Sequence, residues 1–275
     1  MIVDVQHINL NLKIEPCLQK IEGYQILTFK TLRQKTDSLI FYSPEMDFIN
    51  VQINNRPQKF FKRGIEHIVI VESDLEYNKS YELVIEFYGN PTEGLYFSGW
   101  DDTTNRHRKQ IWAHSPQGWM PFINQKHDLL TSEIKLSFDN KFKVFSNGDR
   151  ILEHDNKDGT KTWHYKIEKP HVIYLVCLAI GEYDIKYTTS AKGTPMELWY
   201  YPDQSEYFNS TYIYSEYMID FFEKEIGIDY PWSVYRQAPM VNYMYGGMET
   251  TTATVFGDYM HIPPRAWWMR NYVKC

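Results

Sequence analysis

Strict alternation of apolar and polar residues marks the first two thirds of the chain. The alternating apolar positions of its two clearest segments are Ile8, Leu10, Leu12, Ile14, Tyr81, Leu83, Ile85 and Phe87. Successive side chains of a strand point to opposite faces of a sheet, so this pattern predicts strands with one buried and one wet face. Shorter apolar runs bounded by turn-forming residues occupy residues 39–42, 48–53 and 68–71. We therefore predict an antiparallel β-sandwich or curved β-saddle over residues 1–187.

Three further signals refine this first region. Asn147-Gly148 and Asp158-Gly159 lie between strand-like segments, and both dipeptides are typical of hairpin turns. Residues 172–180 are almost continuously apolar, which predicts a strand buried on both faces. The region should thus end on a central strand of its core.

The pattern changes in residues 188–275, which we predict to be a second domain. Residues 196–201 predict a strand, residues 202–205 a turn with helix-capping residues, and the following segment a helix that ends at Gly227. Three- and four-residue spacing predicts that one aromatic face of this helix packs in the core; its residues are Tyr207, Tyr214, Met218, Phe221 and Phe222. Residues 234–240 predict the next strand.

The sequence Tyr-Gly-Gly-Met-Glu-Thr at residues 245–250 is the clearest candidate for binding chemistry. Paired glycines lack side-chain bulk, so another backbone can approach them closely, and Glu249 places a negative charge beside that approach. On an edge strand, this combination suits an extended peptide with a charged amino terminus. A glycine turn followed by a solvated glutamate is the alternative interpretation.

Residues 246–250 resemble the Gly-x-Met-Glu-Asn motif of the aminopeptidase N and leukotriene hydrolase family, which are gluzincin metallopeptidases. Thr250 departs from this motif, because the family has asparagine there. The resemblance extends over most of the chain, through residues 94–97, 110–114, 145–148, 251–258 and 270–273. It implies a mainly β chain in which residues 188–275 form the β lobe that opens a thermolysin-like α+β catalytic domain.

The resemblance also implies the roles of individual residues. Gly246, Gly247, Met248 and Glu249 would bind the amino terminus of a peptide substrate, with Glu249 holding the ammonium group. His114 and Gln117 would either line the same pocket or lie on a loop between strands. Tyr245, which flanks the motif, would either line that pocket or pack across strands. The corresponding family segment carries an acidic residue that residues 113–117 lack.

The family's zinc ion requires a His-Glu-x-x-His motif with two histidines four residues apart, followed by a later glutamate. No two of the nine histidines have this spacing, and the closest pairs are seven residues apart. We therefore expect no zinc to bind this chain and no catalytic residue within it, with the metal motif placed just beyond Cys275. The resemblance implies the amino-terminal part of a zinc aminopeptidase, inactive alone, whose partner is the missing carboxyl-terminal portion.

Composition limits the classes of protein to which the chain can belong. The net charge is −6 and basic residues are scattered, which excludes a nucleic-acid groove. Three cysteines without CxxC spacing make a disulfide framework improbable and are compatible with a reducing compartment. No membrane-span candidate or targeting segment is seen, so cytoplasmic residence is expected.

A non-catalytic peptide- or partner-binding β module is the alternative from a different class. The aromatic residues of the 205–227 helix, together with Trp267, Trp268, Met269 and Tyr272, distinguish the two. Their exposure would favour the fragment, because an independent module would cover them. For the isolated chain we predict self-association.

Overall fold

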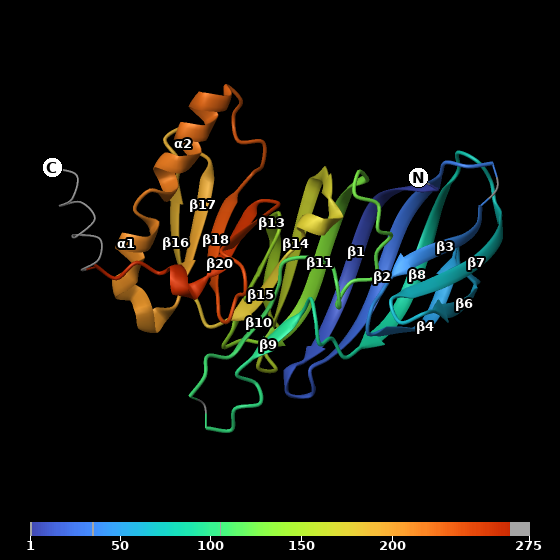
Figure 1. Ribbon diagram of the computed structural model, residues 1–275, viewed down its shortest axis with the longest axis horizontal. Helices are drawn as coiled ribbons and strands as arrows, with labels where there is room; N and C mark the ends of the chain where they lie inside the picture. Colours follow the sequence, from blue (N-terminus) through green and yellow to red (C-terminus); the bar gives the residue numbers. More distant parts are fainter. Residues whose placement is uncertain (1, 35, 105, 265–275) are drawn as a thin grey trace.

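The computed structural model describes residues 2–34, 36–104 and 106–264 of the chain. Its largest element is an eight-stranded sheet with the strand order β13-β14-β11-β1-β2-β8-β4-β5 (Figure 1). These strands are β1 (Val3–Glu15), β2 (Lys20–Thr31), β4 (Met46–Ile53), β5 (Arg56–Pro57), β8 (Ser80–Gly89), β11 (Leu129–Asp139), β13 (Asp149–Asp155) and β14 (Thr160–Val172). All neighbours are antiparallel except β1 and β11, which run parallel. The long connection between β1 and β11 permits the parallel pairing, which a tight hairpin would forbid.

Two smaller sheets share a core with this one. The three-stranded sheet contains β3 (Thr36–Tyr42), β6 (Lys59–Arg63) and β7 (His67–Leu75). The four-stranded sheet contains β9 (Tyr96–Ser98), β10 (Gln110–Ala113), β12 (Lys143–Ser146) and β15 (Leu178–Gly181). Residues from all three sheets form one buried apolar cluster. The predicted sandwich is therefore confirmed.

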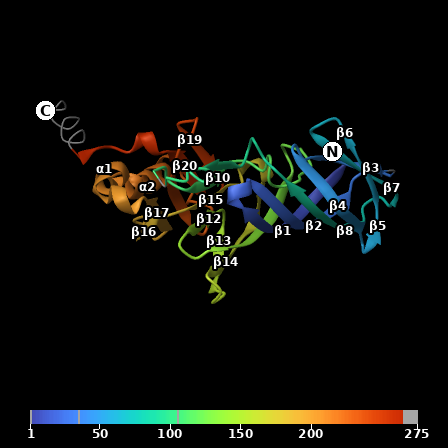
Figure 2. The same cartoon turned by 90° about the horizontal axis from the view of Figure 1, so that it is seen from below.

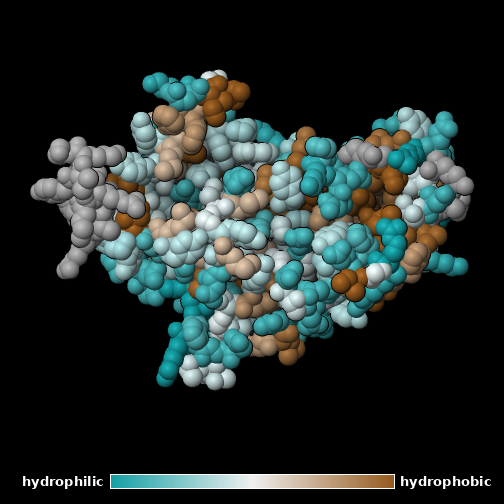
Figure 3. All heavy atoms as spheres, in the orientation of Figure 1, coloured by the Kyte–Doolittle hydropathy of each residue, from teal (hydrophilic) through white to brown (hydrophobic). Residues whose placement is uncertain are grey.

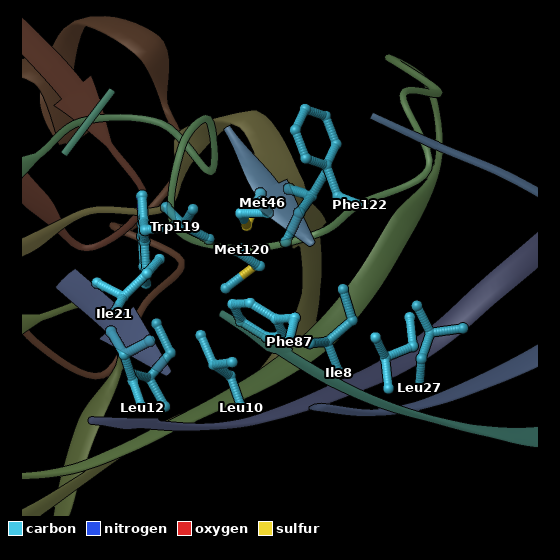
Figure 4. Close-up of a cluster of buried hydrophobic side chains, with 14 of the residues drawn as sticks. Ile8, Leu10, Leu12, Ile21, Leu27, Met46, Phe87, Trp119, Met120 and Phe122 are labelled. Atoms are coloured by element: carbon cyan, nitrogen blue, oxygen red, sulfur yellow. The ribbon is translucent and has the colours of Figure 1, made fainter. Parts of the chain in front are cut away.

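The alternating positions supply that core. Ile8, Leu10 and Leu12 of β1 are at most 4% exposed, and Figure 4 shows them with Phe87 of β8 beneath Met120. Burying one such side chain contributes about 1.5–3 kcal/mol. The 2.0-residue period thus places the sheet's buried face correctly.

Two local predictions in this region are wrong. Asp158-Gly159 does join the paired strands β13 and β14, but Asn147-Gly148 connects β12 to β13, which belong to different sheets. Residues 172–180 are not one strand: a 3₁₀ turn at Ile173–Leu175 separates β14 from β15. There the Leu175 carbonyl accepts from Thr251 N, and Cys177 N donates to Asn147. These contacts satisfy the backbone where the chain crosses between sheets.

A five-stranded sheet forms the other end of the molecule, with the order β16-β17-β18-β20-β19 (Figures 1 and 2). Its strands are β16 (Asp184–Thr189), β17 (Pro195–Tyr200), β18 (Tyr235–Met240), β19 (Gly247–Thr250) and β20 (Ala253–Gly257). β17, β18 and β20 are parallel, whereas both edge strands are antiparallel to their neighbours. Since β16 spans residues 187–188, the division into two domains there stays a prediction.

Each face of this sheet has its own buried cluster. Trp199, Ala238 and Val255 pack on one side with Trp112 and Phe145 of the four-stranded sheet. Leu198 and Met196 pack on the other side with Tyr212 and Ile219 from the helices. The helical segments are η3 (Pro202–Tyr207), α1 (Phe208–Tyr212) and α2 (Ser215–Ile226); short 3₁₀ turns also occur at Pro16–Leu18 and Asp258–Met260.

The predicted helix and its predicted core face both need correction. The helical segment is interrupted before α2, where Tyr214 adopts φ −107° and ψ 1°, although Gly227 does end α2 in a left-handed conformation. The residues of α2 that are buried are Ser215, Ile219 and Glu223. Four of the five residues predicted to be buried are exposed, namely Tyr214 by 53%, Met218 by 47%, Phe221 by 43% and Phe222 by 55%, whereas Tyr207 is half-buried. The row of residues at i and i+4 that meets the sheet includes a serine and a glutamate. Ser215 donates a hydrogen bond to Gln237 of the sheet, and Glu223 accepts one from Tyr230 N in the following loop.

No described helix is long and apolar enough to cross a membrane. Figure 3 shows hydrophobic atoms at the outer end of α2. Ile226 and Ile228 there are 64% and 68% exposed.

Candidate functional site

β19 carries the Gly-Gly-Met-Glu segment at the edge of its sheet. It pairs with β20 on one side, where Gly247 lies opposite Phe256 and Glu249 opposite Thr254. Within the described residues, its position at the end of the strand order leaves the other side without a strand. An added Cβ at Gly246 would meet nothing within 4 Å, so packing within this chain does not require that glycine. The bare edge is suited to pairing with an extended peptide.

Alternation along β19 separates its side chains. Met248 packs against the cluster shared with the four-stranded sheet, and Thr250 lies on the same face. The Thr250 hydroxyl is buried and donates to the Ala253 carbonyl at 2.5 Å, so it closes the turn between β19 and β20. Glu249 points to the opposite face. Thr250 thus has a structural contact within the hairpin.

A pocket of about 740 Å³ adjoins the start of β19. It brings together five of the residues predicted for the site: His114, Gln117, Tyr245, Gly247 and Met248. The other lining residues are Ser115, Pro116, Phe122, Asn124, Lys126, His127, Tyr174 and Tyr243. Segments far apart in the sequence therefore converge on one hollow.

Gly246 and Glu249 are not part of that lining. Glu249 is exposed, and within the described residues its carboxylate has no hydrogen-bond or ion-pair partner. It lies next to the pocket rather than inside it. A ligand must extend along β19 to reach both.

An aromatic cluster forms the inner wall of the pocket. The His114 ring lies 5.5 Å from the Tyr243 ring and 5.4 Å from the Tyr245 ring, both edge to face, and Trp112 stacks on it at 5.9 Å. Burial lowers the pKa of His114, so its imidazole is neutral at pH 7. Burial also raises the pKa of Tyr243 above its ordinary value. His114 is therefore a neutral ring rather than a cation.

Two glycines allow the close loop contact that positions Gln117. Gly94 and Gly118 both have positive φ, and an added Cβ would lie 2.2 Å from Gln117 O and from Glu93 O respectively. The two loops can approach this closely only without side chains at these positions. Gln117 is exposed and donates to the Tyr42 hydroxyl at 3.4 Å. Its amide stays accessible at the rim of the pocket.

Gln110 and Trp112 of β10 fix the loop between β18 and β19. Val241 N donates to Gln110 Oε1 at 2.6 Å, and Trp112 Nε1 donates to Val241 O at 2.9 Å. Gln110 also donates to the hydroxyls of Tyr183 and Tyr201 and is fully buried. Sequence reasoning missed both roles, although the resemblance covered residues 110–114.

Asn147 fixes the turn that follows β19. Its side-chain amide donates to the carbonyls of Leu175, at 3.1 Å, and Thr251, at 2.5 Å, and its oxygen accepts from Cys177 N at 2.6 Å. Gly148 N donates to the Thr252 hydroxyl at 2.7 Å. The Asn-Gly pair, predicted as a hairpin turn, instead joins the four-stranded sheet to the hairpin that bears Glu249.

A buried ion pair supports the same hairpin. Arg236 Nε donates to Glu197 Oε2 at 2.7 Å, and Arg236 N donates to Thr252 O at 2.9 Å. Burial by itself raises the pKa of the Glu197 carboxyl, but Arg236 more than offsets this, and the pKa lies below its ordinary value. Arg236 also donates to the Gly148 carbonyl. Alternation patterns carried no signal for this pair.

Comparison with known proteins relates this fold to a protein family. The family model described as the Peptidase M1 N-terminal domain matches residues 5–175. The chain belongs to this family. Glutamyl aminopeptidase of Bos taurus is 22% identical to it over 202 residues, which cover 70% of this chain and 21% of the relative. The match thus spans about a fifth of the relative's length. The predicted family is confirmed, whereas the site residues from His114 to Glu249 stay predictions.

A metal site in this M1 chain would need several donor side chains that lie close together. Within residues 2–34, 36–104 and 106–264, no group of three or more His, Cys, Asp and Glu side chains is placed to hold a metal ion. These residues therefore do not fit a zinc ion, and no step through a metal follows from them. Cys275 and the aromatic residues at 267–272 lie outside the described residues.

The basic segment at residues 106–109 is only partly exposed to solvent. Arg108 forms an ion pair with Asp203 at 2.8 Å and lies 3.6 Å from the centre of the Tyr201 ring. It joins the loop before β10 to the segment before α1. In this M1 chain the residue connects the four-stranded sheet's loop to the helical segment that follows β17.

Proposed function

We propose that this chain is the substrate-positioning part of a zinc-dependent aminopeptidase, an enzyme that removes amino-terminal residues from peptides. One observation carries the proposal: the unpaired carboxylate of Glu249 projects from a bare edge strand beside a pocket of about 740 Å³. Membership of the M1 family supports it. The name of the bovine relative agrees with it.

Each part of the site has a role in this proposal. The substrate main chain pairs with the free edge of β19, and its ammonium group donates charge-assisted hydrogen bonds to Glu249. The braces from Gln110 and Asn147 fix the loop before β19 and the turn after it, so the strand that bears the carboxylate is held in place before the substrate binds. In the complete enzyme, zinc would supply activation of water, and its ligands would come from outside the described residues. This chain alone should position peptides without cleaving them.

Peptide binding tests the clamp. A peptide with a free amino terminus should bind the purified chain at least about tenfold more tightly than its N-acetylated form, as expected for a charged hydrogen bond. Glu249→Gln should abolish that difference in calorimetric titrations. Glu225→Gln, an exposed α2 residue, is the matched control. Equal affinity of the unmodified chain for both peptides would exclude an ammonium clamp.

Hydrolysis tests the second part of the proposal. The purified chain should release no p-nitroaniline from amino acid p-nitroanilides. Release that a chelator abolishes would show that the chain holds a working metal site.

A non-catalytic peptide- or partner-binding module remains the second candidate, favoured by the lack of a donor group for zinc among the described residues. The exposed aromatic residues of α2 favour the first, because a contiguous apolar patch marks an interface. The proposed partner is a carboxyl-terminal portion that covers α2. The predicted absence of nucleic-acid binding and the predicted cytoplasmic location stay predictions.

A further inference from the structure

The lining of the pocket beside β19 has a distinct chemical character. Aromatic rings or a thioether come from three separate segments, through Phe122, through Tyr174, and through Tyr245 with Met248. Tyr174 and Tyr245 are 45% and 54% exposed, so their rings offer surface to a ligand. His114 adds a neutral ring behind Tyr245. An aromatic side chain entering here would meet ring edges and faces on several sides.

The charges of the residues that line the pocket also favour an uncharged side chain. Among the described residues that line the pocket there is no Asp or Glu, whereas Lys126 lies at its rim. Lys126 forms no ion pair within the described part of the chain. A cationic side chain would lose its hydration here, find no carboxylate and meet a like charge. An acidic side chain would gain only the exposed, solvent-screened charge of Lys126.

We propose that this pocket selects peptides whose first residue is aromatic and rejects those whose first residue is lysine or arginine. The proposal rests on the proposed function, in which Glu249 holds the peptide ammonium. Gly247 and Met248 line the pocket and directly precede Glu249, so the side chain nearest the bound ammonium is the one that reaches it. Tyr245 and Lys126 are the specificity-determining residues.

The test measures binding of tripeptides that differ only in their first residue: phenylalanine, tyrosine, alanine, glutamate or lysine. Calorimetry on the full chain gives the affinities, and saturation-transfer NMR ranks the weak ligands. Phenylalanine and tyrosine should bind at least about tenfold more tightly than alanine, since burying an aromatic ring is worth more than one factor of ten. Lysine should bind more weakly than alanine.

Two exposed residues allow variants that keep the fold. Tyr245→Ala should lower the phenylalanine-to-alanine affinity ratio about three- to tenfold, as loss of a ring contact predicts, whereas Tyr77→Ala, an exposed tyrosine outside the lining, should not. Lys126→Glu should make lysine bind more tightly than alanine. Lys59→Glu on β6 makes the same charge change away from the pocket and should leave the ranking unaltered.

The outcomes separate this proposal from the one on which it rests. Amine-dependent binding with equal affinity for all five peptides would overturn the selectivity and leave the ammonium clamp standing. Tightest binding of the glutamate or lysine peptide would overturn the aromatic preference. If no peptide binds, both proposals fall.

Discussion

The eight-stranded sheet and the five-stranded sheet are held in place by different kinds of contact. The first contributes most of one large apolar cluster, with Leu10, Leu27 and Ile85 fully buried. The second depends on buried polar side chains as well, because Arg236, Gln110 and Asn147 join it to the rest of the molecule. Apolar contacts are non-directional, whereas hydrogen bonds fix positions. The difference suits a scaffold on one side and a precisely placed edge strand on the other.

Breaking the buried ion pair should produce the largest effect. Arg236→Met leaves Glu197 buried and charged, so we expect a loss of about 3–5 kcal/mol in the free energy of unfolding. Arg236→Met combined with Glu197→Leu should recover much of this loss, because no unpaired charge remains. Urea unfolding followed by tryptophan fluorescence measures both.

An exposed pair supplies the matched control. Lys13→Met removes the surface pair with Glu22 and should leave the unfolding midpoint unchanged. A cost for Arg236→Met no larger than for Lys13→Met would contradict the contrast between the two sheets.

Acid should reveal a buried polar group in the first sheet. His171 of β14 is buried, and burial lowers its pKa to about 4, while its Nε2 meets the Ser132 hydroxyl at 2.8 Å. Because the unfolded histidine takes up a proton near pH 6.5 and the folded one does not, its contribution to stability is full above pH 6.5. It should be lost as the pH falls toward 4, by about 3 kcal/mol.

The comparison of His171→Gln with the unmodified chain isolates the contribution of His171 to stability. The stability contribution of Asp128 changes with pH in the opposite direction. Burial raises the pKa of its carboxyl to about 6, so its contribution to stability falls as the pH rises from 3.8 to 6. The difference in stability between variant and parent should therefore shrink on acidification. A difference independent of pH between 7 and 4 would show that His171 does not titrate in this range.

Loss of the hairpin brace should have an intermediate effect. Asn147→Ala leaves Leu175 O, Thr251 O and Cys177 N without their partner, which predicts a loss of about 1–3 kcal/mol. It should also weaken peptide binding, because the hairpin bearing Glu249 is released. Asn156→Ala, in the β13–β14 turn, is the control and should leave binding unchanged. Unaltered peptide affinity in Asn147→Ala would show that the brace does not position the site.

The smallest effect on stability is expected at the surface of α2. Phe222 is 55% exposed and its ring lies 5.5 Å from the neighbouring Phe221 ring, so Phe222→Ser should change stability by less than about 0.5 kcal/mol. It should nevertheless reduce self-association, which light scattering at high concentration measures. Ile49→Ser, a similarly exposed position on β4, should not. A monodisperse monomer before substitution would contradict the prediction of self-association.

Much of the fold and part of the site were predictable from sequence. Strands with a regular 2.0-residue period, such as those containing Ile8 and Leu83, were found because one face is buried along their whole length. His114, Gln117 and Tyr245 were suggested by the resemblance, and the structure brings them to one pocket. Asn147-Gly148 was misjudged because a turn-forming dipeptide does not reveal whether its flanking strands pair with each other. The aromatic face of α2 was misjudged because spacing identifies a face but not what covers it.

The sequence by itself determined the strands, the family and the segment that carries Glu249, since local alternation and a short motif are written in adjacent residues. Only the tertiary structure decided that β19 is an edge strand and that the described residues lining its pocket include no carboxylate. It also decided that Gln110, Asn147 and Arg236 act as braces. Their partners lie 131, 104 and 39 residues away along the chain. Contacts over such separations leave no periodic trace in the sequence.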